Sequence, residues 1–204
     1  MESFVEDKTP EKSKRDFSNY FLTTNEELDR NLGGGVKVGS LGLLAGDMGA
    51  GKSVWVQQIA YGALKCGKTV SYITSEMTAK GLVENMVSLS WEKTEQYFIS
   101  GQFDVIPVVS QSGKVLRTPD VLIKLINLLT SITSEVIVID SLTYFVGKNF
   151  KPKEVIFLFE LCKRLTISGK TIFVTIPTYF PELYDFIELN IMNVCDLILK
   201  LELR

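Results

Sequence analysis

The chain has 204 residues, of which 46% are hydrophobic and 23% charged, with a formal net charge of −2. This composition is that of an ordinary globular domain, and a chain of this length can bury a substantial core. A nucleic-acid-binding surface normally needs an excess of Lys and Arg, which this chain lacks. It also contains no histidine, which excludes acid–base catalysis and metal ligation by imidazole.

The start of the chain differs in composition from the rest. Residues 1–16 are charged and hold few large apolar residues, which is typical of a flexible polar tail. Residues 17–204 are expected to form a single domain. No secretion signal is visible, and no uncharged apolar run is long enough to cross a bilayer. We therefore expect a cytoplasmic protein that reaches a membrane only through partners.

Strands and helices are predicted to alternate along the chain. The predicted helices are 24–32, 52–64, 78–91, 119–133 and 152–165. The predicted strands are 40–46, 69–75, 104–110, 135–140, 170–176 and 195–201, with a helical or irregular segment between the last two. The strands are nearly continuous apolar runs, as buried parallel strands are. This order predicts an α/β fold with a central, mostly parallel sheet flanked by helices.

Caps and apolar faces support several of these helices. Thr24 or Asn25 is expected to cap the first helix, and Gly33 to end it. Thr118 is expected to cap a helix whose first position is Pro119.

The helix over 52–64 should pack onto the sheet through one side. Val54, Ile59 and Ala63 are expected on that inward side.

The stretch GDMGAGKS, over 46–53, fits the pattern G-x-x-x-x-G-K-[ST] of a phosphate-binding loop and lies between a strand and a helix, as that loop requires. Gly49 and Gly51 let the backbone turn its N–H groups toward an anion, at the positive end of the helix. Lys52 can reach the β- and γ-phosphates of a nucleotide, and the Ser53 hydroxyl can bind Mg²⁺. The predicted nucleotide-binding residues are Gly46, Asp47, Met48, Gly49, Ala50, Gly51, Lys52, Ser53 and Val54.

A second motif supports the phosphate loop. The apolar run VIVID ends in Asp140, and a carboxylate at the carboxyl end of a buried parallel strand lies where α/β folds bind ligands. Asp140 can hold the water shell of Mg²⁺ opposite Ser53. The sequence therefore predicts ATP and Mg²⁺ as ligands, with Ser53 and Asp140 on the metal side.

The motifs together resemble the RecA/KaiC-type P-loop ATPases. ELDRNLGGGVKVGSLGLLAGDMGAGKS is similar to their opening helix, glycine turn and phosphate loop, SYITSEMTAKGLVENMVSLSW to their next strand and helix, and VIVIDSLT to their Walker B segment. The resemblance covers residues 20–204. Within this group the small single domain, the IDSLT segment and the polar tail look like the FlaH (ArlH) family, the ATP-binding components of the archaeal flagellum (archaellum) motor.

The resemblance implies catalytic roles for two residues. Glu76 occupies the position of the carboxylate that orients the attacking water, and Thr175 matches the polar sensor near the γ-phosphate. Thr175 can equally be a buried strand residue. Where KaiC-like ATPases often have two adjacent glutamates, this chain has Glu76 and Met77, a departure that favours slow hydrolysis. Of the basic residues near the end of the chain, Lys200 and Arg204 are candidates to reach a neighbour's nucleotide.

A domain of this type can belong to three classes of protein: a DNA-stimulated recombinase, a nucleotide-switched assembly component or a KaiC-like autokinase. Residues 177–195 hold four aromatic and three acidic residues and no Lys or Arg. A rigid aromatic loop of this kind suits a protein interface better than single-stranded DNA. A KaiC-like clock protein needs a second ATPase repeat and a phosphorylated tail, and the sequence shows neither.

The sequence therefore favours an ATP-binding regulatory or assembly component of the archaellum motor. By resemblance its partners are the motor ATPase (FlaI), the membrane platform protein and a scaffold ring, and it forms a homo-oligomeric ring, a hexamer by expectation, beside the membrane-embedded motor. No nucleic-acid partner is predicted. The alternative is a KaiC- or RadB-like ATPase linked to DNA or to signalling.

Overall fold

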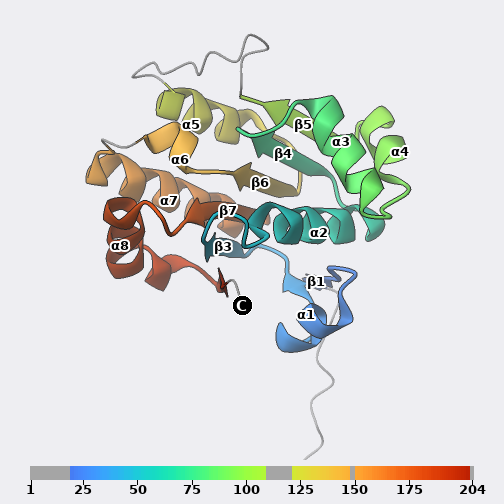
Figure 1. The fold of residues 1–204 in the computed structure, drawn as a ribbon, viewed down its shortest axis with the longest axis horizontal. Coiled ribbons are helices and arrows are strands. Elements are labelled where there is room, and N and C mark those ends of the chain that lie inside the picture. Colours follow the sequence, from blue (N-terminus) through green and yellow to red (C-terminus); the bar gives the residue numbers. More distant parts are fainter. Residues whose placement is uncertain (1–18, 109–120, 148–149, 203–204) are drawn as a thin grey trace, which may run out of the picture.

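The computed structural model describes residues 19–108, 121–147 and 150–202. The expected tail over 1–16, the cap at Thr118 and Pro119, and Arg204 lie outside these residues. A six-stranded sheet in the order β5-β4-β6-β7-β3-β8 forms the centre of the molecule. Every neighbouring pair in it is parallel. Figure 1 shows helices on both faces of this sheet, which confirms the predicted fold class.

The six strands of the central sheet agree with the predicted runs, with shifts at their ends. Their bounds are β3 Leu41–Gly46, β4 Val70–Thr74, β5 Phe103–Pro107, β6 Val136–Asp140, β7 Thr171–Pro177 and β8 Leu197–Leu201. The predicted end of β5 at 109–110 lies outside the described residues. A two-stranded antiparallel sheet, β1 Tyr20–Phe21 with β2 Val36–Lys37, was not predicted.

The helices are more numerous than predicted. Their bounds are α1 Glu26–Asn31, α2 Lys52–Lys65, α3 Ala79–Ser88, α4 Thr94–Ile99, α5 Val121–Ser131, α6 Thr143–Val146, α7 Pro152–Ile167 and α8 Pro181–Asn190, followed by the 3₁₀ turn η2 Met192–Val194. The sequence pattern missed the short helices α4 and α6, which are held by tertiary packing more than by their own periodicity. Within the described ranges no helix is both long and apolar enough to cross a membrane.

Local hydrogen bonds decide where α1 and α3 begin. Asn25, not Thr24, caps α1, because its side-chain oxygen accepts the Leu28 amide at 2.9 Å. Thr78 caps α3 in the same way, accepting the Gly81 amide at 3.1 Å. The helix predicted over 78–91 therefore begins one residue later, and it ends at Ser88.

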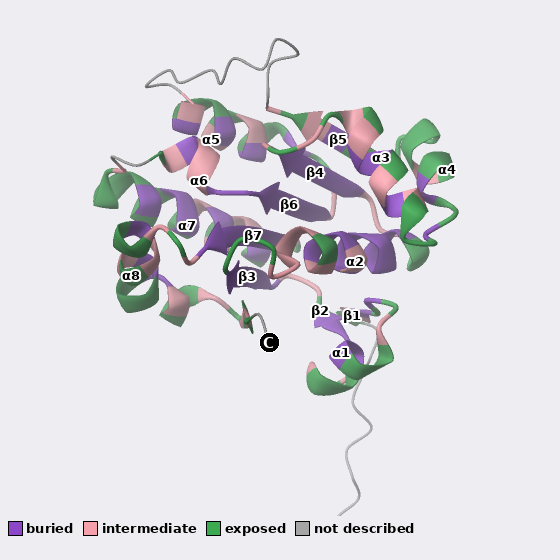
Figure 2. Ribbon diagram, viewed as in Figure 1, coloured by how far each residue is buried: buried purple, intermediate pink, exposed green. Residues whose placement is uncertain are grey.

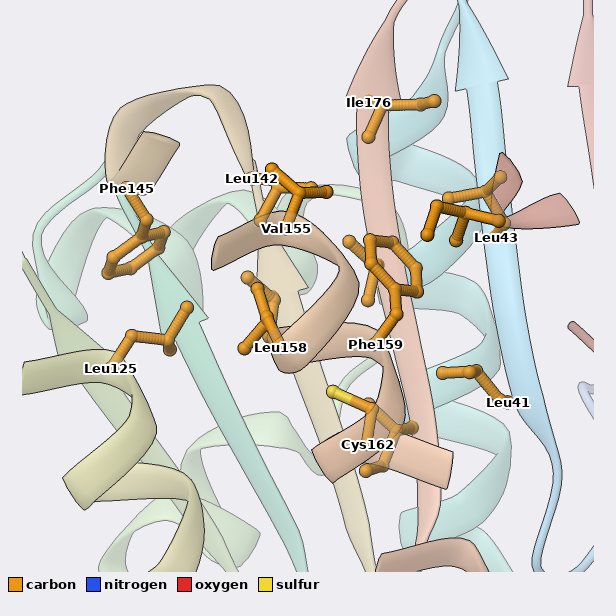
Figure 3. Packing of buried hydrophobic residues seen from close by; sticks show 14 of the residues in the cluster. Leu41, Leu43, Leu125, Leu142, Phe145, Val155, Leu158, Phe159, Cys162 and Ile176 are labelled. Atoms are coloured by element: carbon orange, nitrogen blue, oxygen red, sulfur yellow. The ribbon is translucent and has the colours of Figure 1, made fainter. Parts of the chain in front are cut away.

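Two apolar layers cover the two faces of the sheet (Figure 2). Helices α1, α2 and α3 contribute to one layer, and α5, α6, α7 and α8 to the other. Figure 3 shows the second layer, where Val155, Leu158 and Phe159 of α7 point onto the strands. Successive strand residues alternate between the layers, as the period of two requires.

The prediction for the inward side of α2 is partly wrong. Ile59 and Ala63 are completely buried, whereas Val54 is 45% exposed. Val54 lies in the first turn of α2, directly after the phosphate loop and before the helix packs onto the sheet.

The segment after β7, which was expected to be helical or irregular, is mostly the helix α8, and most of its aromatic residues do not form the exposed loop surface expected of a protein interface. Leu183 and Ile187 of α8 are buried, and Phe180, Tyr184 and Phe186 pack against the same apolar layer. Tyr179, by contrast, is 49% exposed. The three acidic residues Glu182, Asp185 and Glu188 are exposed. The aromatic side chains of this segment therefore serve mainly the core.

Candidate functional site

The phosphate loop joins the carboxyl end of β3 to the first turn of α2. Gly49 and Gly51 have φ of +79° and +84°, the left-handed conformation that glycine adopts without strain. A Cβ on Gly49 would meet no atom within 4 Å, and one on Gly51 would come no closer than 3.8 Å to Trp55. The positive φ values, and not a lack of room for a side chain, therefore explain why glycine stands at these two positions.

The backbone N–H groups of this loop are available to a ligand. The Ala50 amide donates to the Asp47 carbonyl at 3.1 Å, and the Trp55 amide to the Gly51 carbonyl at 2.9 Å. Across the described chain, no acceptor is found for the amides between these two turns, which are those of Gly51, Lys52, Ser53 and Val54, or for that of Gly49. Free N–H groups at a helix N-terminus form an anion site.

Lys52 is folded onto the loop that it follows. Its Nζ donates to the Gly46 carbonyl at 2.9 Å and to the Asp47 carbonyl at 2.8 Å. Burial is the main reason that the Lys52 pKa is lowered, and the nearby carboxylates of Glu76, Asp140 and Asp47 oppose the shift. The ammonium group is thus held at the mouth of the loop among carboxylates that it does not directly pair with.

Asp140 ends β6 and is almost completely buried, with 3% exposure. Thr175 Oγ1 donates to its Oδ1 at 2.6 Å, and the Tyr72 hydroxyl donates to its Oδ2 at 2.7 Å. Asp140 lies opposite Thr74 of β4 in the sheet register. Each carboxylate oxygen therefore has one hydroxyl partner, and Thr175 is engaged with the carboxylate of the predicted metal site.

Glu76 follows the end of β4 on a short turn. The amides of Glu76 and Met77 donate to Thr74 Oγ1 at 3.2 and 3.3 Å, which fixes the direction of the turn. Partial burial of the carboxylate and then repulsion from Asp140 raise the Glu76 pKa, while Lys52 opposes the shift. The carboxylate therefore shares its electrostatic surroundings with both Lys52 and Asp140.

The loop after β7 touches the phosphate loop directly. The Thr178 amide donates to the Gly46 carbonyl at 3.0 Å. The Thr178 hydroxyl donates to the Asp47 carboxylate. This contact ties the start of the α8 segment to the loop that carries Lys52.

The structure thus brings most of the sequence-predicted residues to one edge of the sheet. The phosphate loop follows β3 and Asp140 ends β6, while Glu76 follows the end of the neighbouring strand β4 and Thr175 lies on the neighbouring strand β7. Lys200 lies on β8 and pairs with Glu188 at 2.6 Å, so its charge is already neutralised within the chain. Sequence reasoning missed Tyr72, Gln57 and Thr178.

Comparison with known proteins places the chain in a family. The family model described as "ATPase: KaiC" matches residues 22–203. The chain belongs to the KaiC family of ATPases. Among the curated relatives of this KaiC-type chain, the archaeal flagellar ATP-binding protein FlaH of Sulfolobus acidocaldarius is 30% identical over 182 residues, 88% of this chain and 77% of that protein. FlaH of Methanocaldococcus jannaschii is 29% identical over 160 residues, 78% of this chain and 68% of that protein.

The fold of this KaiC-type ATPase agrees with that of a solved relative. The crystal structure of flagellar accessory protein FlaH from Methanocaldococcus jannaschii has a TM-score of 0.72 and 24% identity, over 87% of this chain and 77% of that one. The resemblance stated from the phosphate loop, the second strand and the Walker B segment is therefore confirmed, and FlaH proteins match over most of the chain.

The residues at the site fit a nucleotide with Mg²⁺. The open loop with its free N–H groups suits phosphates. Across the described residues, no three His, Cys, Asp or Glu side chains lie together in a way that could hold a metal ion. Mg²⁺ is commonly bound by one or two side-chain oxygens together with substrate phosphates and water, and Ser53 with Asp140 would form such a set.

Proposed function

We propose that this chain binds ATP with Mg²⁺ at the carboxyl edge of its sheet. The observation that carries the proposal is the phosphate loop, whose amides between Gly49 and Val54, apart from that of Ala50, have no acceptor within the described residues and which is contacted by the Lys52 ammonium. Lys52 would exchange its bonds to the Gly46 and Asp47 carbonyls for bonds to the β- and γ-phosphates. This exchange replaces neutral acceptors by charged ones, which gives stronger hydrogen bonds.

The other residues of the site complete the binding arrangement. Ser53 and Asp140 would hold the metal, directly or through water. When bound, Mg²⁺ would neutralise part of the negative charge of the phosphates. Glu76, with its raised pKa, is the group at this edge best suited to accept a proton from an attacking water. Thr175 would sense the γ-phosphate through its bond to Asp140.

The test is a titration of a fluorescent ATP analogue into the wild type and Lys52→Ala, with Mg²⁺ and with EDTA. Loss of a charge-assisted contact costs roughly 1.5–3 kcal/mol, which is about 10- to 150-fold in affinity. Asp140→Ala should weaken the Mg²⁺ dependence more than the binding of metal-free nucleotide.

A matched control is Lys68→Ala, because Lys68 is also a partly buried lysine but pairs with Glu135 at 2.7 Å at the opposite edge of the sheet. Lys68→Ala should keep the wild-type affinity. Wild-type affinity in Lys52→Ala would contradict the proposal.

We further infer that the chain is a nucleotide-dependent regulatory or assembly component of the archaellum motor. The support is the match to FlaH proteins over most of the chain. Its partners would be the motor ATPase FlaI, the membrane platform protein and a scaffold ring, and it would assemble with itself into a hexameric ring. It would then act in the cytoplasm, peripheral to the motor.

In this function ATP would act as a ligand that selects a conformation more than as fuel. The Thr178 contacts to Gly46 and Asp47 support this, because they connect the phosphate loop to the segment that leads into α8. A coupling of about 1–3 kcal/mol gives roughly 5- to 150-fold tighter docking with ATP. Affinity for purified FlaI, measured with ATP–Mg²⁺, with ADP and without nucleotide, tests this step, and equal affinity in the three states would contradict it.

The DNA-linked alternative makes a different prediction. Glu182, Asp185 and Glu188 are exposed on α8, where they repel phosphates. We therefore expect no appreciable binding of single-stranded DNA at physiological salt. Micromolar binding in an anisotropy titration, weakening steeply with salt, would favour the alternative.

A further inference from the structure

A buried tyrosine contacts Asp140, although nothing in the sequence motifs assigns it a role. Tyr72 on β4 is completely buried, and its hydroxyl donates to Asp140 Oδ2 at 2.7 Å. On the other side, Thr175 on β7 is also completely buried and donates to Oδ1 at 2.6 Å. The two hydroxyls hold the carboxylate between them.

The strand register explains why these three side chains meet. Strand β6 lies between β4 and β7, and Asp140 is the partner of Thr74 on β4. Tyr72 precedes Thr74 by two residues and so faces the same side of the sheet. A tyrosine is long enough to reach a diagonal neighbour on an adjacent strand. Its ring meets Phe103 edge to face, with 6.4 Å between the centroids, so packing fixes the direction of the hydroxyl.

Gln57 extends this contact to the helix of the phosphate loop. It lies on α2 and is 1% exposed. Burial is the main reason that the Tyr72 pKa is raised, and the side chain of Gln57 is close enough to Tyr72 to oppose that shift. Its Oε1 atom is buried and has no partner within the described residues. An unpaired buried acceptor costs free energy, so a glutamine at this position is not explained by packing. Asp140, Tyr72 and Gln57 thus link β6 to the helix that begins with Lys52.

We propose that Tyr72 is a positioning residue for Asp140, with Thr175 as its counterpart, and that it sets the Mg²⁺ affinity of the site. The inference rests on the proposed function, since it concerns how the same site holds its metal. A carboxylate oxygen has two lone pairs. A hydroxyl takes one on each oxygen, and the others remain free for a metal-bound water at a fixed orientation. Tyr72 itself would contact neither the nucleotide nor the metal.

The experiment compares the wild type with Tyr72→Phe in the full chain. Phe keeps the ring and its packing on Phe103 and removes the bond to Asp140. With a fluorescent ATP analogue at fixed concentration, the Mg²⁺ concentration that gives half-maximal binding should rise about 10- to 100-fold, which is the usual effect of removing an outer partner of a metal ligand. Nucleotide affinity in EDTA should stay within about twofold of the wild type, because no phosphate contact is lost.

Two further variants separate positioning from general stability. Phe103→Leu disturbs the packing of the Tyr72 ring but keeps the hydroxyl, so it should lower the melting temperature and move the Mg²⁺ midpoint less than Tyr72→Phe does. Thr175→Val removes the second hydroxyl and should raise the midpoint, whereas Thr175→Ser keeps the hydroxyl and should restore it. Mn²⁺ electron paramagnetic resonance on the same variants reports the metal environment directly, and Tyr72→Phe should release bound Mn²⁺ at concentrations where the wild type retains it.

The outcomes separate this inference from the function on which it rests. A wild type that binds nucleotide no better than Lys52→Ala would overturn the proposed function. A wild type with Lys52-dependent, Mg²⁺-dependent binding and a Tyr72→Phe variant with the same midpoint would overturn only the role of Tyr72. Equal losses in Mg²⁺ and in EDTA would also overturn it, because they would show a structural role. If Tyr72→Phe fails to fold, the Thr175→Val and Thr175→Ser pair decides, and an unchanged midpoint in Thr175→Val would overturn the proposal.

Discussion

Charged side chains at the two ends of the parallel sheet differ in whether they form ion pairs. At the amino end, Lys68 pairs with Glu135 at 2.7 Å, and Lys163 donates to both oxygens of Asp196 at 2.7 and 2.8 Å. The hydrogen bond from Lys68 is the main reason that the Glu135 pKa is lowered. Burial would raise the Asp196 pKa, but bonds from the Leu41 amide and from Lys163 outweigh it and the pKa is lowered.

At the carboxyl end, Lys200 on β8 pairs with Glu188, but the charges around the phosphate loop have no such pairs. Lys52 donates only to backbone carbonyls, and its pKa is lowered, chiefly by burial. The Glu76 pKa is raised, chiefly by burial and next by Asp140. Both shifts disfavour the charged forms, so the charges of Lys52 and Glu76 destabilise the fold when no ligand is bound. A bound nucleotide with its metal would supply the missing charges.

Charged side chains thus serve stability at one end of the sheet and ligand binding at the other. Charges at the amino end are neutralised within the chain and stabilise the fold. The charges of Lys52 and Glu76 at the carboxyl end remain available to a ligand, which is typical of functional sites. A substitution of a charged group at the carboxyl end should therefore act mainly on nucleotide binding and turnover, and one at the amino end mainly on stability.

The largest expected effect is on turnover at the carboxyl end. Across the described residues the arginines are Arg30 on α1 and Arg164 in the last turn of α7, elements that lead into amino ends of strands. An arginine finger is worth about 10³–10⁵ in rate, so the isolated protein should hydrolyse ATP slowly. Glu76→Gln should lower the remaining single-turnover rate by about 10²–10⁴-fold with little change in nucleotide affinity.

Phosphate release measured under single-turnover conditions checks this expectation, with Glu135→Gln at the amino end as the control. Glu135→Gln should leave the rate unchanged. Sustained hydrolysis at several turnovers per second by the isolated wild type would contradict the prediction of slow turnover. An unchanged rate in Glu76→Gln would remove Glu76 from the catalytic position.

The next effect is on stability at the amino end. Asp196 Oδ2 accepts the amide of Leu41 at 2.9 Å, and Leu41 is completely buried. Asp196→Ala leaves that amide without its acceptor, which costs about 1–3 kcal/mol, near the lower end because water reaches the exposed Asp196 position. Urea unfolding measures the loss. Asp196→Asn keeps an acceptor oxygen and should lose less, and nucleotide affinity should be unchanged in both variants.

The pH dependence of this contribution has a definite sign. The Asp196 pKa is lowered in the folded state, so its stabilisation is complete above the unfolded value of about 3.9. It is lost as the pH falls through the lower folded value. The difference in stability between the wild type and Asp196→Ala should therefore shrink below about pH 3.9. A constant difference across that range would mean that the carboxylate charge contributes nothing.

Much of the site could be predicted from the sequence because its signals are local. The phosphate loop is a continuous stretch, and Asp140 ends an apolar run of its own strand. The strand pattern also predicted the parallel sheet, because buried parallel strands are apolar along their whole length. Asn25 and Thr24 could not be separated by sequence alone, since either can cap a helix and the choice depends on backbone conformation.

The missed residues depend on contacts between strands that are far apart in sequence. Tyr72 belongs to a run that looks like ordinary core, and only the register of β4 against β6 places its hydroxyl on Asp140. Thr178 could not be connected to Asp47 without knowing that β7 lies beside β3. The segment that forms α8 could be predicted only as helical or irregular, because its helical period is short and its buried residues, Leu183 and Ile187, lie among acidic neighbours.

The smallest expected effect is a gain in stability at the carboxyl end, and its sign is opposite to that at the amino end. Glu76→Gln removes a carboxylate whose pKa is raised by burial and by Asp140, so the variant should be more stable without nucleotide. Although the carboxylate is partly buried, the residue as a whole is exposed, so solvent screens its charge. The gain in the free energy of unfolding should therefore be about 0.2–1 kcal/mol.

The raised pKa of Glu76 also determines the pH range in which Glu76→Gln is more stable than the wild type. The cost of the ionised Glu76 is present above its folded pKa and disappears as the pH falls below the unfolded value of about 4.3. Urea unfolding of both proteins at pH 7 and at pH 4, without nucleotide or Mg²⁺, measures the difference. A variant that is less stable than the wild type at pH 7 would show that Glu76 stabilises the fold, as Asp196 does, and the contrast between the two ends of the sheet would then not hold at this residue.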